Sequence, residues 1–475
     1  MNELWKAVTL PLIALGLVGC QFYSSVEPPK IDSNHQYLTQ ETFTPTQYSN
    51  FFQQFQDDNL ISLIQLAIKN NQDFKIAIEK ISEFESFYGI EAAKSYPGVQ
   101  VDINAQRTRS SKSGFSEIQG APFSLGAGAN KSIVTNIFIQ AFNVAWEIDL
   151  FGRIRNSKKR AKEQIEEMKA EEKGVYLTLV SDVALTYFAL QTYSRLIDIT
   201  KSSIDDLNQV TIFYQSRFSS GIDPTQAAYD IERQSAELNQ MLLDLEKSYR
   251  VYFDHLAVLV GEEPVNFSFG LKPFKFLGSD QLFLKVQLPS ELLKNRPDLL
   301  VAEKQLIQAG YSVKIAQADL FPTFSLLGAF GFASARVPTW ITHSNSFWSV
   351  GPTVRWPAFQ GFQYLSQLNV QKSKQKQAAL HYKSVFLKAL EDVENSLVGF
   401  FNQEKIAKEA QTAYSLQIKI YEANSNLTCV GIRSEDYDLK QKIVLQDQQK
   451  KMVVEEFKTF QTLIQLYKAM GGEWK

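Results

Sequence analysis

The chain has 475 residues, and its 49 Lys and Arg side chains nearly balance 51 Asp and Glu side chains, for a formal net charge of −2 at pH 7. Because no basic block accompanies this balance, the composition excludes the electrostatic footprint of a nucleic-acid-binding protein. The four histidines do not have metal-ligand spacing, and no phosphate loop, GxSxG or HExxH motif is present. No catalytic site, metal site or cofactor is therefore predicted.

The N-terminus has the features of a secretory signal. Lys6 precedes an apolar run that ends at Val18, and this run is shorter than the ~20 apolar residues that a membrane-spanning helix needs. We predict a signal peptide over 1–19. Beyond residue 19 no apolar run of membrane-helix length is expected, so a chain that crosses a membrane would have to do so with strands.

The signal ends in Leu17-Val-Gly-Cys20, which resembles the bacterial lipobox. In that motif a peptidase cleaves just before a cysteine that becomes acylated, with palmitate for example. We therefore predict a lipid on Cys20 and a lipidated N-terminal segment over 20–56; the alternative is an ordinary signal peptide that contains a cysteine. Gln21, where aspartate would argue otherwise, favours the outer membrane. Cys429 is then left without a disulfide partner.

The rest of the chain is written twice. Motifs in the first half recur 225 residues later up to the middle of the unit and 210 residues later beyond it, so the first copy is longer in between, where 114–131 is expected to be a loop. We predict a first copy over 57–264, a linker over 265–286 and a second copy over 287–475. The paired motifs are Asn70-Asn-Gln-Asp73 with Asn295-Arg-Pro-Asp298, Pro97 with Pro322, Ser220-Gly-Ile222 with Val430-Gly-Ile432, and Val260-Gly261 with Met470-Gly471.

Each copy begins with a helical pattern and continues with two short strands. The helices are predicted over Leu60–Lys94 and Glu291–Asp319, each ended by the proline that follows. The segments after them alternate apolar and polar residues, the period of a sheet with two different faces. Four strands cannot close a membrane barrel, whose smallest examples have about 8. Several chains must therefore share one barrel. The alternating segments are Val99–Gln106 and Phe142–Asp149 in copy one, and Phe324–Phe332 and Trp348–Trp356 in copy two.

A very long helix follows the strands in each copy, over Arg153–Ser219 and Gln363–Cys429. At ~1.5 Å per residue, each would extend about 100 Å. A glycine-containing turn at Gly221 or Gly431 then sends a second helix back, to Val260 or Met470. Each copy is thus predicted to be a strand hairpin joined to a hairpin of long helices.

Several motifs together resemble the bacterial outer-membrane factors, the TolC and OprM-like (NodT-type) efflux lipoproteins. The resemblance covers nearly the whole mature chain. It implies a mainly α protein with a small membrane β-barrel, in which a homotrimer forms a 12-stranded barrel continued by a 12-helix periplasmic tunnel. The motifs are Trp146-Glu-Ile-Asp-Leu-Phe-Gly-Arg153, Leu288–Asp298, Ala318–Leu326, Trp348–Pro352, Trp356–Phe359 and Leu466–Trp474.

The same resemblance implies a function. The chain would be a passive exit duct in the outer membrane, anchored by lipid, for small molecules such as drugs or toxic compounds. Its partners would be a periplasmic membrane-fusion adaptor and an inner-membrane transporter of the RND or ABC type. Alternatives are the exit duct of a type I protein secretion system, which shares the fold, and a structural periplasmic coiled-coil protein, against which the alternating strands argue. Nothing in the sequence favours an enzyme.

The resemblance also implies that the two glycine-containing turns form the periplasmic tip, where the tunnel narrows and the adaptor docks. Family members commonly have acidic rings after the second glycine. Here Tyr437 and Lys440 stand where an acidic residue is often seen, with carboxylates one or two places away. The alternative is that these carboxylates are solvated turn residues. The residues predicted for the tip and its gate are Gly221, Asp223, Gly431, Arg433, Glu435, Asp436 and Asp438.

Overall fold

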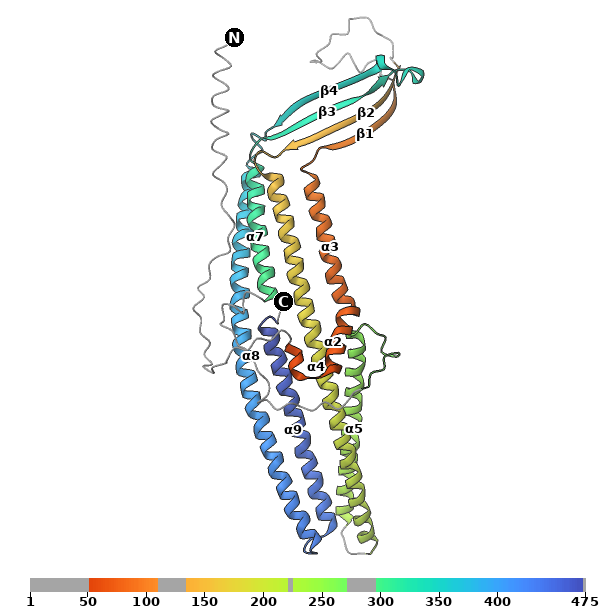
Figure 1. The fold of residues 1–475 in the computed structure, drawn as a ribbon, viewed down its shortest axis with the longest axis vertical. Helices are drawn as coiled ribbons and strands as arrows, with labels where there is room; N and C mark the ends of the chain where they lie inside the picture. Colours follow the sequence, from red (N-terminus) through yellow and green to blue (C-terminus); the bar gives the residue numbers. More distant parts are fainter. Residues whose placement is uncertain (1–50, 110–133, 221–224, 271–295, 473–475) are drawn as a thin grey trace. The chain divides into compact units, whose positions relative to one another are not determined.

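A computed structural model describes residues 51–109, 134–220, 225–270 and 296–472 (Figure 1). The predicted lipid site at Cys20, the turn residues Gly221 and Asp223, and most of the predicted linker lie outside the described residues. In chain order the elements are η2 (Phe51–Phe55), α2 (Asp58–Asn70), α3 (Gln72–Ala93), β1 (Gly98–Arg109), β2 (Val134–Ile148), α4 (Arg153–Ser219), α5 (Thr225–Leu259), α7 (Pro297–Ala318), β3 (Thr323–Ser334), η5 (Val337–Thr339), η6 (His343–Asn345), β4 (Ser346–Arg355), α8 (Gln363–Cys429) and α9 (Glu435–Ala469).

The chain divides into two compact units, and each unit draws on both copies. Unit 1 contains the sheet and the adjoining ends of α3, α4, α7 and α8. Unit 2 contains η2, α2, α5, α9 and the remaining parts of the long helices. The predicted fold is confirmed, because each copy has a helix, a strand hairpin and a long helical hairpin, and α4 and α8 have the predicted bounds.

The first predicted helix differs from the structure at one residue. It is two helices, α2 and α3, interrupted at Asn71, which has an extended backbone (φ −56°, ψ 131°). The Oδ1 of Asn71 accepts a 3.0 Å hydrogen bond from the backbone N–H of Phe74, and its Nδ2 donates to the Leu259 carbonyl. The side chain of Asn71 therefore caps α3 and holds the end of α5, and this explains the break.

The sheet in unit 1 has four antiparallel strands in the order β1-β2-β3-β4, as Figure 1 shows. The central pairing, β2 with β3, joins the two copies. Its register confirms the predicted alternation, because Val101, Phe142, Phe330 and Trp348 lie opposite one another across all four strands on one face. These side chains are 43% exposed or more, so the apolar face is not covered within this chain.

The other face of the sheet is polar. Asp102 on β1 accepts hydrogen bonds from Asn143 on β2 and from Gln100, and Ser349 shares this face on β4. Within the described residues, β1 and β4 each pair along one edge only. The sheet therefore presents an apolar face, a polar face and two edges with backbone groups left to satisfy.

The turn from β2 into α4 is fixed by charged side chains of the Trp146–Arg153 motif. The Asp149 carboxylate accepts hydrogen bonds from the backbone N–H groups of Ile154 and Arg155 and so caps α4. Arg153 forms a two-pronged ion pair with Glu147 at 3.1 and 2.7 Å. These contacts explain why the motif needs these residue types at this spacing.

The start of the shorter helix and the end of the returning helix meet at equivalent positions in both copies of unit 2. In copy two, Arg296 donates a 2.8 Å hydrogen bond to the Ala469 carbonyl; in copy one, Asn71 donates to the equivalent carbonyl of Leu259. The glycine after each returning helix has a positive φ, and a Cβ at Gly261 would lie 2.7 Å from a backbone oxygen. Only glycine fits this close approach.

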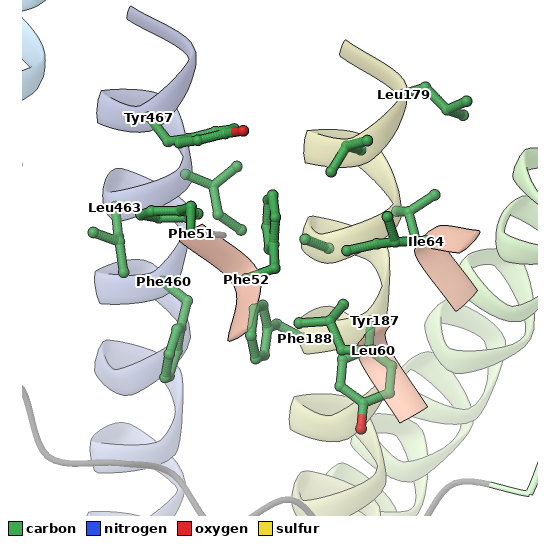
Figure 2. Packing of buried hydrophobic residues seen from close by; sticks show 14 of the residues in the cluster. Phe51, Phe52, Leu60, Ile64, Leu179, Tyr187, Phe188, Phe460, Leu463 and Tyr467 are labelled. Carbon is green, nitrogen blue, oxygen red and sulfur yellow. The ribbon is translucent and has the colours of Figure 1, made fainter. Parts of the chain in front are cut away.

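The main core of unit 2 is aromatic (Figure 2). Phe188 on α4 stacks on Phe460 on α9 at 4.5 Å, and Phe55 of η2 approaches Phe188 edge-on at 5.3 Å. Beside them, the Tyr187 hydroxyl donates to Asp57, which also caps α2. Burial, together with this hydrogen bond, raises the pKa of Tyr187, so its hydroxyl stays a donor. The core thus joins the N-terminal segment to helices of both copies.

One helix among the described residues, α4, is long and apolar enough to cross a membrane by length and composition. However, 67% of its apolar window is buried inside the protein, and a mostly buried window is typical of a core helix. The sequence-based expectation that no such run follows residue 19 was therefore wrong as a statement of composition, although the packing of α4 is that of a core helix.

Candidate functional site

The turn between α8 and α9 closes through Gly431, as predicted. Gly431 has φ +76°, and the N–H groups of Gly431 and Ile432 donate to the carbonyls of Thr428 and Leu427 at 2.9 and 3.0 Å. This hydrogen-bond pattern ends a helix in a left-handed residue, which a side chain would strain. Ile432 is 70% exposed, so the tip of this turn presents an apolar side chain to its surroundings.

The predicted carboxylates lie in the first turn of α9. Glu435, Asp436 and Asp438 follow Ser434, the residue that precedes the helix. Carboxylates in this position are stabilised by the positive end of the helix dipole. The Arg433 guanidinium lies 4.2 Å from the centre of the Tyr437 ring, so the cation is stacked on the same turn that carries the carboxylates.

Farther along α9, polar side chains connect this helix with α4 of the other copy. Lys440 donates a hydrogen bond to the Tyr214 hydroxyl at 2.5 Å, and its ammonium lies 4.4 Å from the centre of that ring. Lys442 forms a 2.7 Å ion pair with Asp206, whose side chain is only 5% exposed. Gln446 donates to the same carboxylate. These bonds tie the two helical hairpins together near the turn.

A further contact lies within the second hairpin. The Tyr421 hydroxyl on α8 lies 3.4 Å from an oxygen of Asp438 on α9. Burial and the Asp438 carboxylate raise the pKa of Tyr421, so the phenol remains protonated at neutral pH. Asp438 is therefore engaged inside its own hairpin, whereas Glu435 is exposed.

Sequence reasoning located part of this site. It identified Gly431, Arg433 and the three carboxylates, which the structure brings together at one turn. It did not identify the ties through Asp206 and Tyr214, which lie more than 200 residues from their partners. The one available signal was the departure at Lys440, where the family often has an acid: a cation there is suited to the Tyr214 ring.

The described residues contain no group of three or more His, Cys, Asp or Glu side chains that could hold a metal ion. The charges at the turn are instead engaged with aromatic rings, amides and opposite charges. Such an arrangement can hold helices together and set an electrostatic field.

Comparison with known proteins decides the family. A model of the outer membrane efflux protein family matches residues 63–262 and 288–472, one segment in each copy. The chain belongs to this family. It is therefore an outer-membrane component of an efflux system and a transport protein, as the motifs predicted.

Curated relatives extend over almost the whole chain. The solvent efflux pump outer membrane protein SrpC of Pseudomonas putida is 26% identical over 496 residues, covering 99% of both chains. The cation efflux system protein CusC of Escherichia coli O6:H1 is 24% identical over 488 residues, covering 98% of both chains. Among solved structures, the outer membrane channel CmeC of Campylobacter jejuni matches with a TM-score of 0.79 and 19% identity, covering 94% of this chain and 95% of that one. This last likeness concerns the fold.

Proposed function

We propose that three copies of this chain assemble into the outer-membrane exit duct of a tripartite efflux system. The observation that carries this proposal is the open sheet of an outer membrane efflux protein, with one apolar face, one polar face and edge strands paired on one side only. In lipid each unpaired backbone group costs several kcal/mol, so the edges must find partners. Three copies supply twelve strands, enough to close a barrel with its polar face toward a water-filled lumen.

The helices support the same assembly. Exposed apolar side chains recur along α8, among them Leu380, Leu387 and Leu416, each more than 50% exposed in the single chain. Neighbouring helices of other copies would cover such side chains. Three copies contribute four long helices each, α4, α5, α8 and α9, which form the periplasmic tunnel of the duct.

The duct itself is passive, and its energy comes from its partners. We propose a periplasmic membrane-fusion adaptor and an inner-membrane transporter of the RND or ABC type as those partners. The relatives are named for the efflux of solvents and of cations, which favours small molecules rather than secreted proteins as the cargo. A wide aqueous tunnel selects little by itself, so the transporter chooses the substrate.

The turn at Gly431 is proposed as part of the gate at the periplasmic tip, with Arg433, Glu435, Asp436 and Asp438, and with Gly221 and Asp223 of the first copy. Threefold symmetry would convert each carboxylate into a ring of three around the axis. Such rings attract cations and raise the cost of moving an anion past them. Arg433, stacked on Tyr437, lies where it can also reach a neighbouring hairpin.

Conductance tests this gate. We expect the combined Arg433→Ala and Asp436→Ala variant to conduct more than the wild-type protein in planar bilayers without an adaptor, and to prefer cations less. The matched control is Lys408→Ala with Glu409→Ala, an exposed pair of opposite charges on α8 away from the turn. Unchanged conductance and selectivity in a properly assembled gate variant would show that these side chains are ordinary solvated turn residues.

We propose that Cys20 carries the lipid that anchors the N-terminus in the outer membrane, on the strength of the Leu17–Cys20 motif. The Cys20→Ser substitution should remove the acceptor thiol, abolish incorporation of a tagged fatty acid and leave an unprocessed precursor. The barrel would still hold the assembled duct in the membrane. Equal labelling of the wild-type protein and the Cys20→Ser variant would overturn the assignment.

A further inference from the structure

The two strand hairpins repeat each other residue for residue. In copy one Gly98 pairs with Ala145, and in copy two Thr323 pairs with Arg355. These positions differ by 225 residues on the first strand and by 210 on the second, the same two offsets that relate the sequence motifs. The duplication therefore extends to the register of the strands.

Side chains at the base of each hairpin obey the same offsets. The indole Nε1 of Trp146 donates a 3.1 Å hydrogen bond to the carbonyl of Ser95. In copy two, Trp356 donates at 3.3 Å to the carbonyl of Leu320. Because donors and acceptors correspond by the offsets of 210 and 225, the two hairpins are equivalent in their polar contacts as well as in their pairing.

The seam between the copies provides a template for the seam between chains. Within one chain, β2 of copy one pairs with β3 of copy two, and Ala145 lies opposite Leu327. In a closed trimer, β4 of one chain would meet β1 of the next, and these strands are the equivalents of β2 and β3. Applying the offsets to the Ala145–Leu327 pair gives Arg355 and Asp102.

We infer that β4 pairs with β1 of the neighbouring copy in this register, so that Arg355 forms an ion pair with Asp102 of that copy on the polar face of the barrel. The inference rests on the trimeric barrel proposed above and specifies how that barrel closes. Opposite charges directly across an antiparallel pair stabilise it, whereas a slip of two residues leaves Arg355 facing a neutral amide side chain, Gln100 or Asn104.

The surroundings of both residues suit this pairing. Arg355 is exposed at the end of β4, with no side-chain contact to a carboxylate among the interactions of the described residues. Asp102 is held in place by hydrogen bonds from Asn143 and Gln100, which leaves lone pairs for a guanidinium. An Asp that is already oriented loses less conformational entropy when a cation joins it.

The apolar face agrees with the same register. The offsets place Val354 opposite Ile103 of the neighbour, and Trp356 opposite Val101. All four side chains are more than 50% exposed in the single chain. Their equivalents at the seam inside the chain include the pair of Trp146 and Leu326. The register thus matches apolar with apolar and acid with base at once.

Cysteine cross-linking reads the register directly. In a Cys429→Ser background of the full-length protein, we expect Arg355→Cys combined with Asp102→Cys to form cross-linked dimers and trimers under mild oxidation. The matched controls combine Arg355→Cys with Gln100→Cys or with Asn104→Cys, on the same face but two residues away along β1. Diagonal neighbours of this kind lie about 7–8 Å apart, so their cross-linked fraction should be several-fold lower.

Charge exchange provides a second readout. Arg355→Asp alone should lower the temperature at which the trimer dissociates, and Arg355→Asp with Asp102→Arg should restore part of that loss. A trimer that cross-links best through Gln100 or Asn104 would overturn the register while leaving the trimeric duct intact. Protein that is monomeric in every variant and in the wild type would overturn the duct and the register together.

Discussion

Phe188→Ala should destabilise the protein by about 3–5 kcal/mol, the cost of removing a large aromatic side chain from a packed core. Phe188 is fully buried and stacks on Phe460 from the other copy, while Phe55 from the N-terminal segment packs against its edge. The cavity would loosen three parts of the chain at once (Figure 2). We expect a large fall in the unfolding temperature, followed by circular dichroism in detergent.

Phe188→Leu is the matched control, because leucine keeps most of the apolar volume and adds no polar group. It should cost distinctly less than the alanine variant. If the two variants unfolded at the same temperature, the aromatic stack between α4 and α9 would not contribute as the packing indicates.

Arg296→Ala should have the second largest effect, about 2–3 kcal/mol, because it removes a buried donor and leaves its partners unpaired. The Arg296 side chain is 8% exposed and forms ion pairs with Asp298 and Asp392 at 2.8 and 3.1 Å. It also donates to the Ala469 carbonyl at the end of α9. Removal would release the joint between α7, α8 and α9, and denaturant unfolding of the purified protein measures the loss.

Two variants separate charge from position at this joint. Arg296→Lys keeps the charge but not the planar fork, and it should recover only part of the stability. Asn71→Ala removes the equivalent, uncharged donor of copy one and should cost less than Arg296→Ala, about 1 kcal/mol. An Arg296→Ala protein as stable as Asn71→Ala would argue against the role assigned to the buried ion pairs.

The architecture could be predicted because it is encoded in periodicity and repetition. The offsets of 225 and 210 residues fixed the two copies, and the glycine turns fixed the ends of α4, α8 and α9. The break at Asn71 was missed because it depends on a contact with Leu259, 188 residues away. A helical pattern continues on both sides of Asn71, so local sequence gives little warning there.

The candidate gate could be located from the sequence but not described. Its turn is marked by Gly431 and a run of charges, which are local signals. The bonds from Lys442 and Gln446 to Asp206 join residues about 240 positions apart, and only the folded hairpins show which side chains meet. The Tyr437 ring likewise gains its meaning from the guanidinium of Arg433 above it.

The mass of the purified protein in mild detergent tests the central claim most directly. Light scattering coupled to size exclusion, corrected for bound detergent, should give a protein mass of about 160 kDa, since three chains of 54.0 kDa complete the barrel. The sample should be strongly helical with a minor strand content. A monodisperse species of about 54 kDa with the same helicity would contradict a duct built from three open sheets.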